Sequence, residues 1–560
     1  MKSAHKRELP YIIFLIVVIV HIFLLCQIGL KREYMFTDEV YSYGLANSEN
    51  YSFLDPDNNP TLLNWTKNSF FSNYIKYDET APFSFRAAFV NQANDVHPPL
   101  YYCLLHIVCY FFKDYVYSPI PGLFLNLLMI PLIDGLLFYI SRCIFSNSYL
   151  ALSAVVLWSF SAAGLSNAVF IRMYLLMTLF VLLLIAYHYF VLKHESFLQL
   201  LTKHKQPKSF IRYLILYVSL CAIITLGGLT HYYFYFFAAT LGLCVCVYLL
   251  ILKKYRLLFA YGSALWLGVG VAFAIFPSAI HHIFGYRGSY ATGHLGSFTF
   301  SKFYENFKFI NDSLLGGCFL PLIIAVILFI SGRYFASRID RYSVTAGTLS
   351  ISFTPTKKAP LLLVITPKKW LFLFILIATV GFLYVAIQGS EIISSRYIYP
   401  AYPILSIAVI SLCCKLWGNY KNSSLTFFVF AGIIAALSVN LYGIDWQYKD
   451  YQGLQSAVED LKGKDCIIVC KDEYWVNVLQ GINLYLNMDE VRCVYESDLP
   501  NIEQILTERS SDDALCIAFF SDNGYSSEDQ ARILTGIINY TSYSNFELTY
   551  DYQTTVYSLA

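Results

Sequence analysis

Two adjacent carboxylates, Asp38 and Glu39, follow the first long apolar stretch of the chain, within the segment Phe36–Gly44. A carboxylate just outside an apolar layer is suited to act as a general base, which takes a proton from the hydroxyl or amine of an acceptor. The plainer alternative is a solvated acidic loop without chemistry. We therefore interpret Asp38 and Glu39 as candidate catalytic residues.

A second polar group occurs in the sequence Asp95-Val-His97-Pro-Pro-Leu-Tyr101-Tyr. Successive prolines fix φ and remove backbone donors, so they predict a helix that begins here at a defined angle. Asp95 and His97 then lie at its N-terminus, where the helix dipole favours a bound phosphate, and Tyr101 lies in its first turn. We predict substrate-binding roles for all three. The alternative is a helix start with an incidental histidine.

Cations and aromatic residues recur at the ends of later apolar runs. Arg172 and Tyr174 stand in one such segment, His231 in a second, and Arg396 and Tyr397 in a third. The guanidinium fork of arginine matches the geometry of a phosphate group, so these positions predict contacts with an anionic substrate. Ionisable residues at the edge of a membrane indicate function by default. The alternative is side chains that only reach the membrane interface from within.

The composition requires a membrane protein. Of 560 residues, 57% are hydrophobic and only 14% are charged, and the mean hydropathy is +0.53. Soluble globular chains carry about 25% charged residues. The aromatic share of 18% suits interfacial belts. These values exclude a soluble enzyme, a nucleic-acid binder and a disordered scaffold, and they predict a polytopic α-helical membrane protein.

The apolar stretches predict about 11 spans. The predicted spans are Pro10–Leu30, Ser118–Ile140, Tyr149–Leu165, Arg172–Leu192, Phe210–Gly228, Tyr232–Leu252, Leu257–Phe276, Leu314–Ile330, Trp370–Ile387, Ile398–Leu416 and Leu425–Leu441.

Charge sets the predicted orientation. Basic residues precede the first span and cluster in Lys193–Arg212, so both belong inside the cell. The number of crossings between them must then be even. This requires that Pro99–Phe112, which is shorter than the ~20 residues of a crossing, lies on the outer face instead. The chain is then N-in and C-out. The tail from Asp445 agrees, because its 20 acidic and 7 basic residues suit the outer side.

The same patterns divide the chain into two domains. Residues 1–444 form the predicted transmembrane domain, whose outer loop 31–117 carries the acids and a surface helix near 99–112. Residues 445–560 contain two short apolar runs of buried-strand type, Cys466–Cys470 and Ala514–Phe520, with helix-like stretches between them. Alternating strand and helix predict a small extracytoplasmic α/β domain. No Gly-rich phosphate loop occurs in it, so we assign it no catalysis.

Taken in order along the chain, these motifs resemble the membrane glycosyltransferases of the GT-C superfamily. The nearest group is the bacterial relatives of protein O-mannosyltransferases and aminoarabinose transferases. The resemblance covers roughly residues 10–445 and rests on the acid pair after the first span, His97-Pro-Pro-Leu-Tyr-Tyr, Arg172-Met-Tyr, Thr230-His-Tyr-Tyr and Arg396-Tyr before a proline.

The resemblance implies a hexosyl- or pentosyltransferase of the cell envelope in the plasma membrane. It implies a polyprenyl-phosphate-linked sugar as the donor, inverting transfer on the outer face, and Asp38 as the base. The acceptor would be a protein, a lipid or a polysaccharide, and no nucleic acid is expected. Some relatives hold a divalent metal near this site, so the resemblance leaves a divalent metal open here. His281, His282 and His294 show no convincing ligand spacing, and we assign no metal ligands.

Two other functions account for part of the pattern. A transporter or flippase of lipid-linked or envelope substrates would explain the spans, but not the long acidic outer loop or the folded tail. The sequence also lacks the paired broken helices that mark many transport sites. A ligase or polymerase of the O-antigen type would use similar donors, but would carry its large loop later in the chain.

Overall fold

The computed structural model describes residues 2–49, 54–77, 79, 83–193, 207–336, 341–345, 348–352, 366–417, 424–444, 451–472, 477–509, 514–521 and 524–560. The chain divides into two compact units. Unit 1 comprises Met1–Cys26, Asn126–Val169 and Met173–Asp445, and unit 2 comprises Gln27–Leu125, Phe170–Arg172 and Trp446–Ala560. The predicted boundary at residue 445 stays a prediction. Unit 2 joins the predicted outer loop with the tail.

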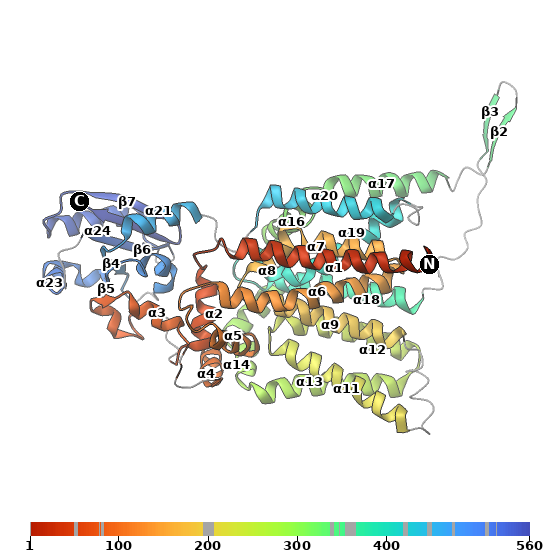
Figure 1. The fold of residues 1–560 in the computed structure, drawn as a ribbon, viewed down its shortest axis with the longest axis horizontal. Helices are drawn as coiled ribbons and strands as arrows, with labels where there is room; N and C mark the ends of the chain where they lie inside the picture. The colour runs from red at the N-terminus through yellow and green to blue at the C-terminus, as the bar shows by residue number, and fades with distance from the viewer. Residues whose placement is uncertain are drawn as a thin grey trace. The chain divides into compact units, whose positions relative to one another are not determined.

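Unit 1 is built from helices. In chain order they are α1 (Lys2–Gly29), α6 (Ile120–Phe145), α7 (Ser148–Ser159), α8 (Ala162–Val169), α9 (Tyr174–Lys193), α11 (Pro207–Gly228), α12 (Tyr233–Ile251), α13 (Tyr255–Ile275), α14 (Ser278–Phe284), α15 (Tyr286–Leu295), α16 (Phe300–Ser313), α17 (Phe319–Ala336), α18 (Pro367–Gln388), η2 (Ser395–Ala401), α19 (Tyr402–Trp417) and α20 (Ser424–Tyr442). A short hairpin, β2 (Arg341–Thr345) and β3 (Thr348–Ser352), follows α17. Figure 1 shows the long helices lying alongside one another, with α11 against α13 and α7 against α20.

The prediction of a polytopic helical membrane protein is confirmed. Among the described residues, eight helices are long and apolar enough to cross a membrane, or nine if the bent pair α7–α8 is one span. The axes of this pair differ by 60°. Two further predicted spans overlap the shorter apolar helices Tyr213–Gly228 and Phe319–Gly332. These helices also carry exposed large apolar side chains, such as Phe23 and Val380, as expected for surfaces that face lipid.

A polar triad lies inside the helical unit, and sequence reasoning did not find it. Asp134 of α6 accepts a hydrogen bond from the Ser159 hydroxyl of α7 at 2.9 Å, and its other oxygen lies 3.0 Å from Nδ1 of His21 on α1. All three side chains are fully buried. Breaking a buried pair of this kind leaves an uncompensated polar group, so the triad fixes α1 against α6 and α7.

Unit 2 contains the predicted α/β fold. Its six-stranded sheet has the order β1-β5-β4-β6-β8-β7. The strands are β1 (Thr66–Lys67), β4 (Asp465–Cys470), β5 (Glu490–Tyr495), β6 (Leu515–Phe520), β7 (Phe546–Asp551) and β8 (Thr554–Leu559). β4 pairs in parallel with β5 and β6, whereas the outer pairings are antiparallel. The two predicted strands are therefore the central β4 and β6, whose residues are buried throughout.

Helices complete unit 2. Those of the tail are α21 (Tyr451–Leu461), η3 (Val478–Gly481), α22 (Ile482–Tyr485), η4 (Glu496–Asn501), α23 (Ile502–Thr507) and α24 (Ser527–Asn539). Those of the predicted outer loop are α2 (Thr37–Asn47), η1 (Pro60–Leu63), α3 (Ser69–Ile75), α4 (Arg86–Asn94) and α5 (Leu100–Phe111). α5 is the helix predicted near 99–112, and its 12 residues are too few to cross a membrane.

The predicted orientation is tested by labelling with a membrane-impermeant thiol reagent. The basic residues of Lys193–Arg212 and the acidic tail place a cysteine at Ser209 inside and one at Ser521 outside, although residues 194–206 lie outside the described part of the chain. In intact cells we expect labelling above the wild-type background at position 521 only. Labelling at position 209 alone would reverse the orientation.

Candidate active site

The first turn of α2 carries both predicted catalytic acids. Carboxylates at this end of a helix are stabilised by its dipole. The Glu39 carboxylate also accepts a hydrogen bond at 2.8 Å from the backbone N–H of Phe36, the residue before the helix. This return contact is half of a capping box, and it explains why the chain starts a helix at this point.

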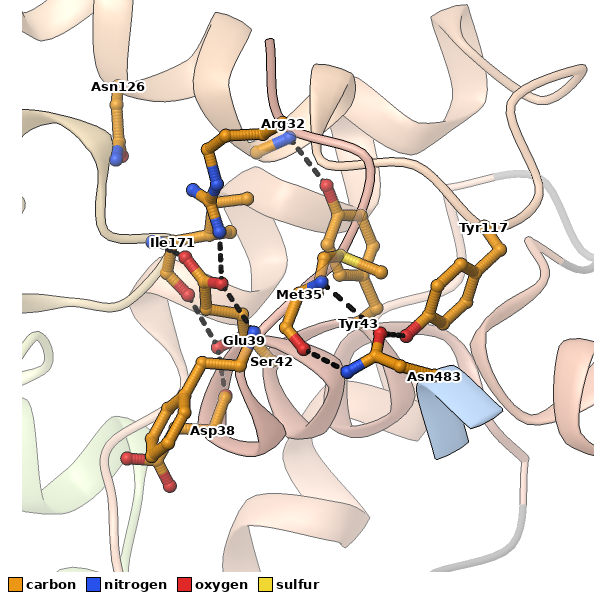
Figure 2. Close-up of polar contacts among 12 residues, drawn as sticks. Arg32, Met35, Asp38, Glu39, Ser42, Tyr43, Tyr117, Asn126, Ile171 and Asn483 are labelled. Atoms are coloured by element: carbon orange, nitrogen blue, oxygen red, sulfur yellow. Dashed lines mark hydrogen bonds and ion pairs between the residues drawn. The ribbon is translucent and has the colours of Figure 1, made fainter. Parts of the chain in front are cut away.

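The Glu39 carboxylate has several protein partners. Its side chain is fully buried, forms an ion pair with the equally buried Arg32, and accepts a second backbone hydrogen bond at 2.9 Å from the N–H of Ile171. Figure 2 shows its carboxylate directed toward Arg32 and the Ile171 backbone, while the carboxylate of Asp38 points to another side. These contacts hold the Glu39 side chain in the structure, and its predicted catalytic role stays a prediction.

Side chains of α2 bind both backbone polar groups of Ile171, its N–H and its carbonyl oxygen. Glu39 accepts from its N–H, and the Ser42 hydroxyl donates to its carbonyl oxygen at 2.9 Å. Gly122 permits the close approach of this segment, because an added Cβ would lie 2.2 Å from a side-chain carbon of Ile171. We call these two contacts the Ile171 clamp. The clamp fixes the position of the next residue, Arg172, against α2.

Arg172 and Asp38 form a loose ion pair beside the clamp. Nη2 of Arg172 lies 3.8 Å from Oδ1 of Asp38, and the two side chains are 8% and 21% exposed. Nη1 donates to the Tyr102 hydroxyl at 3.2 Å and to the Ser42 hydroxyl at 3.4 Å. Asp38 is therefore the more accessible of the two acids on α2. A separation of 3.8 Å is too long for a hydrogen bond, so the guanidinium is not committed to Asp38.

The charges near Arg172 affect the hydroxyl groups of two tyrosines, Tyr102 and Tyr74. Burial raises the pKa of the Tyr102 hydroxyl, the positive charge of Arg172 opposes that shift, and the negative charges of Asp95 and Asp38 add to it. Burial likewise raises the pKa of Tyr74, with Asp95 adding to the shift and Arg172 opposing it. Both hydroxyls therefore remain protonated at neutral pH, and that of Tyr102 accepts a hydrogen bond from Arg172. The Asp95 carboxylate is therefore near enough to both tyrosines to influence the pKa of each hydroxyl.

The remaining predicted residues of unit 2 differ in exposure. Asp95 ends α4, where its backbone N–H donates to the carbonyl of Asn91 at 2.9 Å, and His97 lies half-buried two residues later. Tyr101 is fully buried and packs edge-on against Tyr102 with ring centroids 5.8 Å apart. Burial raises the pKa of Tyr101 as well. A substrate role for Tyr101 stays a prediction, and in the structure its ring belongs to the core of unit 2.

The other four predicted residues gather in unit 1. The ring of Tyr174, the first residue of α9, lies 5.6 Å from that of His231 and 6.2 Å from that of Tyr397. The Arg396 guanidinium stands over the Tyr397 ring at 5.2 Å. Tyr233 completes this aromatic cluster at 5.0 Å from His231 and 6.3 Å from Tyr397. An aromatic cluster with one arginine suits a sugar ring or an anionic group.

Sequence reasoning therefore selected residues that the structure collects into two groups, but it missed several of their partners. Arg32, Ser42, Tyr74 and Tyr102 all contact or electrostatically influence the acids and Arg172. Ser42 follows Asp38 by four residues, so helical spacing alone could have placed it on the same face. Nothing in the sequence links the acids to Ile171. Among the described residues, no three His, Cys, Asp or Glu side chains form a metal-binding group.

The fold and the clusters define a polytopic membrane protein whose α/β unit contains a carboxylate–arginine site. No protein-family model and no curated protein matches the chain. Among solved structures it is similar to ArnT from Cupriavidus metallidurans bound to undecaprenyl phosphate, with 13% identity and a TM-score of 0.48, over 98% of this chain and 97% of that chain. A likeness with a TM-score below 0.5 does not assign a function, which must come from the residues of the site.

The buried position of Glu39 gives a stability prediction. Glu39→Gln removes the charge that Arg32 requires, and loss of one partner of a buried pair costs roughly 3–5 kcal/mol. We expect a clear fall in the melting temperature of the detergent-solubilised protein. Glu79→Gln is the matched control, because the Glu79–Lys113 pair is about half exposed on both sides. Equal melting temperatures for the two variants would contradict the assignment of Glu39 to the clamp.

Proposed function

We propose that the protein is a glycosyltransferase that moves a sugar from a polyprenyl-phosphate-linked donor to an acceptor at the outer face of the plasma membrane. The observation that carries the proposal is the pairing of the accessible Asp38 with the nearly buried Arg172 at 3.8 Å. One group can take a proton and the other can hold a phosphate. The order of the sequence motifs along the chain supports the same reading.

In the proposed reaction Asp38 takes the proton of the acceptor hydroxyl or amine. The acceptor oxygen or nitrogen then attacks the anomeric carbon in line, and the bond from that carbon to the phosphate oxygen breaks. The electron pair of this bond leaves with the lipid phosphate, and the anomeric configuration inverts. A phosphate ester is already a good leaving group, so catalysis requires positioning and charge stabilisation rather than a covalent intermediate.

Arg172 would meet the charge that develops on the leaving phosphate. Its guanidinium is already held by the Tyr102 and Ser42 hydroxyls, so little reorganisation is needed when the phosphate arrives. The protonated hydroxyls of Tyr74 and Tyr102 are candidate donors to the same phosphate. His97 and Asp95 remain proposed substrate contacts in unit 2, and Tyr174, His231, Arg396 and Tyr397 remain proposed contacts in unit 1.

The role of Asp38 is tested by removing its basicity while keeping its shape. Asp38→Asn should lower sugar transfer by roughly 10²-fold or more, the usual cost of losing a general base. Donor binding should survive, because the proposed phosphate contact is on Arg172. The assay is transfer by the purified protein from polyprenyl-phosphate sugars, with undecaprenyl phosphate binding measured separately. Asp114→Asn, an exposed acid of the same loop, is the control. Transfer by Asp38→Asn at the control rate would end the assignment.

The phosphate contacts are tested by Arg172→Lys and Arg396→Lys. Lysine keeps the positive charge but loses the two-pronged geometry, so each change should raise the donor KM by roughly tenfold, about one lost charge-assisted contact. Arg142→Lys, on α6 at a predicted inner end, provides the control. A donor KM and a turnover that match this control in both variants would remove both arginines from the donor site.

A further inference from the structure

The tail of unit 2 contacts α2 and the segment before it at three positions that bracket Asp38. Asn483 of α22 binds the backbone of Met35, Gln553 accepts a hydrogen bond from the Thr37 hydroxyl at 3.0 Å, and Asn477 accepts one from the Tyr41 hydroxyl at 2.8 Å. The acid at position 38 therefore lies on a helix that the tail holds before and after it.

The Asn483 side chain binds both backbone polar groups of Met35. Its side-chain oxygen accepts from the Met35 N–H at 3.3 Å, and its side-chain nitrogen donates to the Met35 carbonyl at 2.9 Å. The same oxygen accepts a hydrogen bond from the Tyr117 hydroxyl, as Figure 2 shows. Asn483 is nearly fully buried, so loss of its amide would leave both polar groups of Met35 without this partner. One side chain thus fixes the chain three residues before Asp38.

The contacts divide α2 into two adjacent faces. Thr37 and Tyr41 are four residues apart and share the face that meets Gln553 and Asn477. Asp38 and Ser42 share the next face, which meets Arg172 and Ile171. The tail therefore binds one face of α2, and the adjacent face carries Asp38 toward Arg172. A shift of α2 along or about its axis would change the Asp38–Arg172 geometry directly.

Further contacts make the loop and the tail one folded body. β1 of the loop pairs with β5 of the tail, the Asn68 side chain donates to the carbonyl of Met488 at 2.8 Å, and the Trp65 indole donates to the carbonyl of Ile505 at 2.9 Å. The loop therefore follows the tail as a unit. We infer that the C-terminal α/β domain is a positioning domain for Asp38, with Asn483 as its principal positioning residue. This inference rests on the proposed function of Asp38.

The first arm of the test measures hydrogen exchange on the purified full-length protein and needs no activity. Asn483→Ala should speed amide exchange in residues 36–41 by tenfold or more, on the order of one lost buried hydrogen bond. If Asn483→Ala does not fold, Gln553→Ala takes its place, because Gln553 is partly exposed and this change removes only the Thr37 contact. Gln553→Ala should also speed exchange at the same amides, by less than tenfold. Asn539→Ala is the control, since Asn539 is exposed on α24 of the same domain. Exchange in α2 that matches the control in both variants would overturn the inference.

The second arm asks whether the effect acts through Asp38. We expect Asn483→Ala to lower kcat by about tenfold or more, because a small misplacement of a catalytic group is costly, while the donor KM stays within about twofold. In an Asp38→Asn background the same change should cause no further loss, since there is no base left to position. An equal loss in both backgrounds would overturn the inference. A wild-type protein without transfer activity would instead reject the proposed function and leave the exchange result to decide whether the tail holds α2.

Discussion

The arrangement of the site depends on one residue, Ile171, whose backbone N–H and C=O are both bound by side chains of α2. Glu39 accepts from the N–H of Ile171 and Ser42 donates to its carbonyl, so the backbone that carries Arg172 is bound to the helix that carries Asp38. The clamp requires Glu39 to be charged and buried, which requires Arg32, and it requires a glycine at position 122 to make room for Ile171. These contacts hold the backbone of Arg172 so that its guanidinium lies 3.8 Å from the candidate base.

The clamp also explains how two neighbouring acids acquire different roles. Consecutive residues of a helix point about 100° apart, so Asp38 and Glu39 face different surroundings although they are adjacent. Glu39 is directed into the interior of unit 2, where both of its carboxylate oxygens accept hydrogen bonds, and Asp38 keeps a partly exposed carboxylate. The tail of unit 2 adds the third constraint, because Asn483, Gln553 and Asn477 hold the helix from its other face. The proposed reactive acid, Asp38, and the acid that holds the clamp, Glu39, are thus separate residues.

The sequence predicts features that arise from local composition and misses those that arise from distant contacts. Apolar length located the spans, and the buried-strand runs at Cys466–Cys470 and Ala514–Phe520 became the central strands of the sheet. The His21–Asp134 pair joins residues 113 positions apart, and the Asn483–Met35 contact joins residues 448 positions apart. No periodicity records such pairings. The choice of Asp38 over Glu39 as the base came from the resemblance, and burial supplies an independent physical reason for it.

The most direct test of the central proposal measures cleavage of the bond between the anomeric carbon of the donor sugar and its phosphate oxygen. The purified protein is incubated with a labelled polyprenyl-phosphate sugar and an extract of envelope acceptors, and the lipid product and the anomeric configuration of the transferred sugar are determined. We predict release of the free polyprenyl phosphate that requires the acceptor, with inversion at the anomeric carbon. Retention of configuration would contradict the single in-line displacement at Asp38. Movement of the intact donor across a vesicle membrane without cleavage would contradict the transferase itself and identify a transporter.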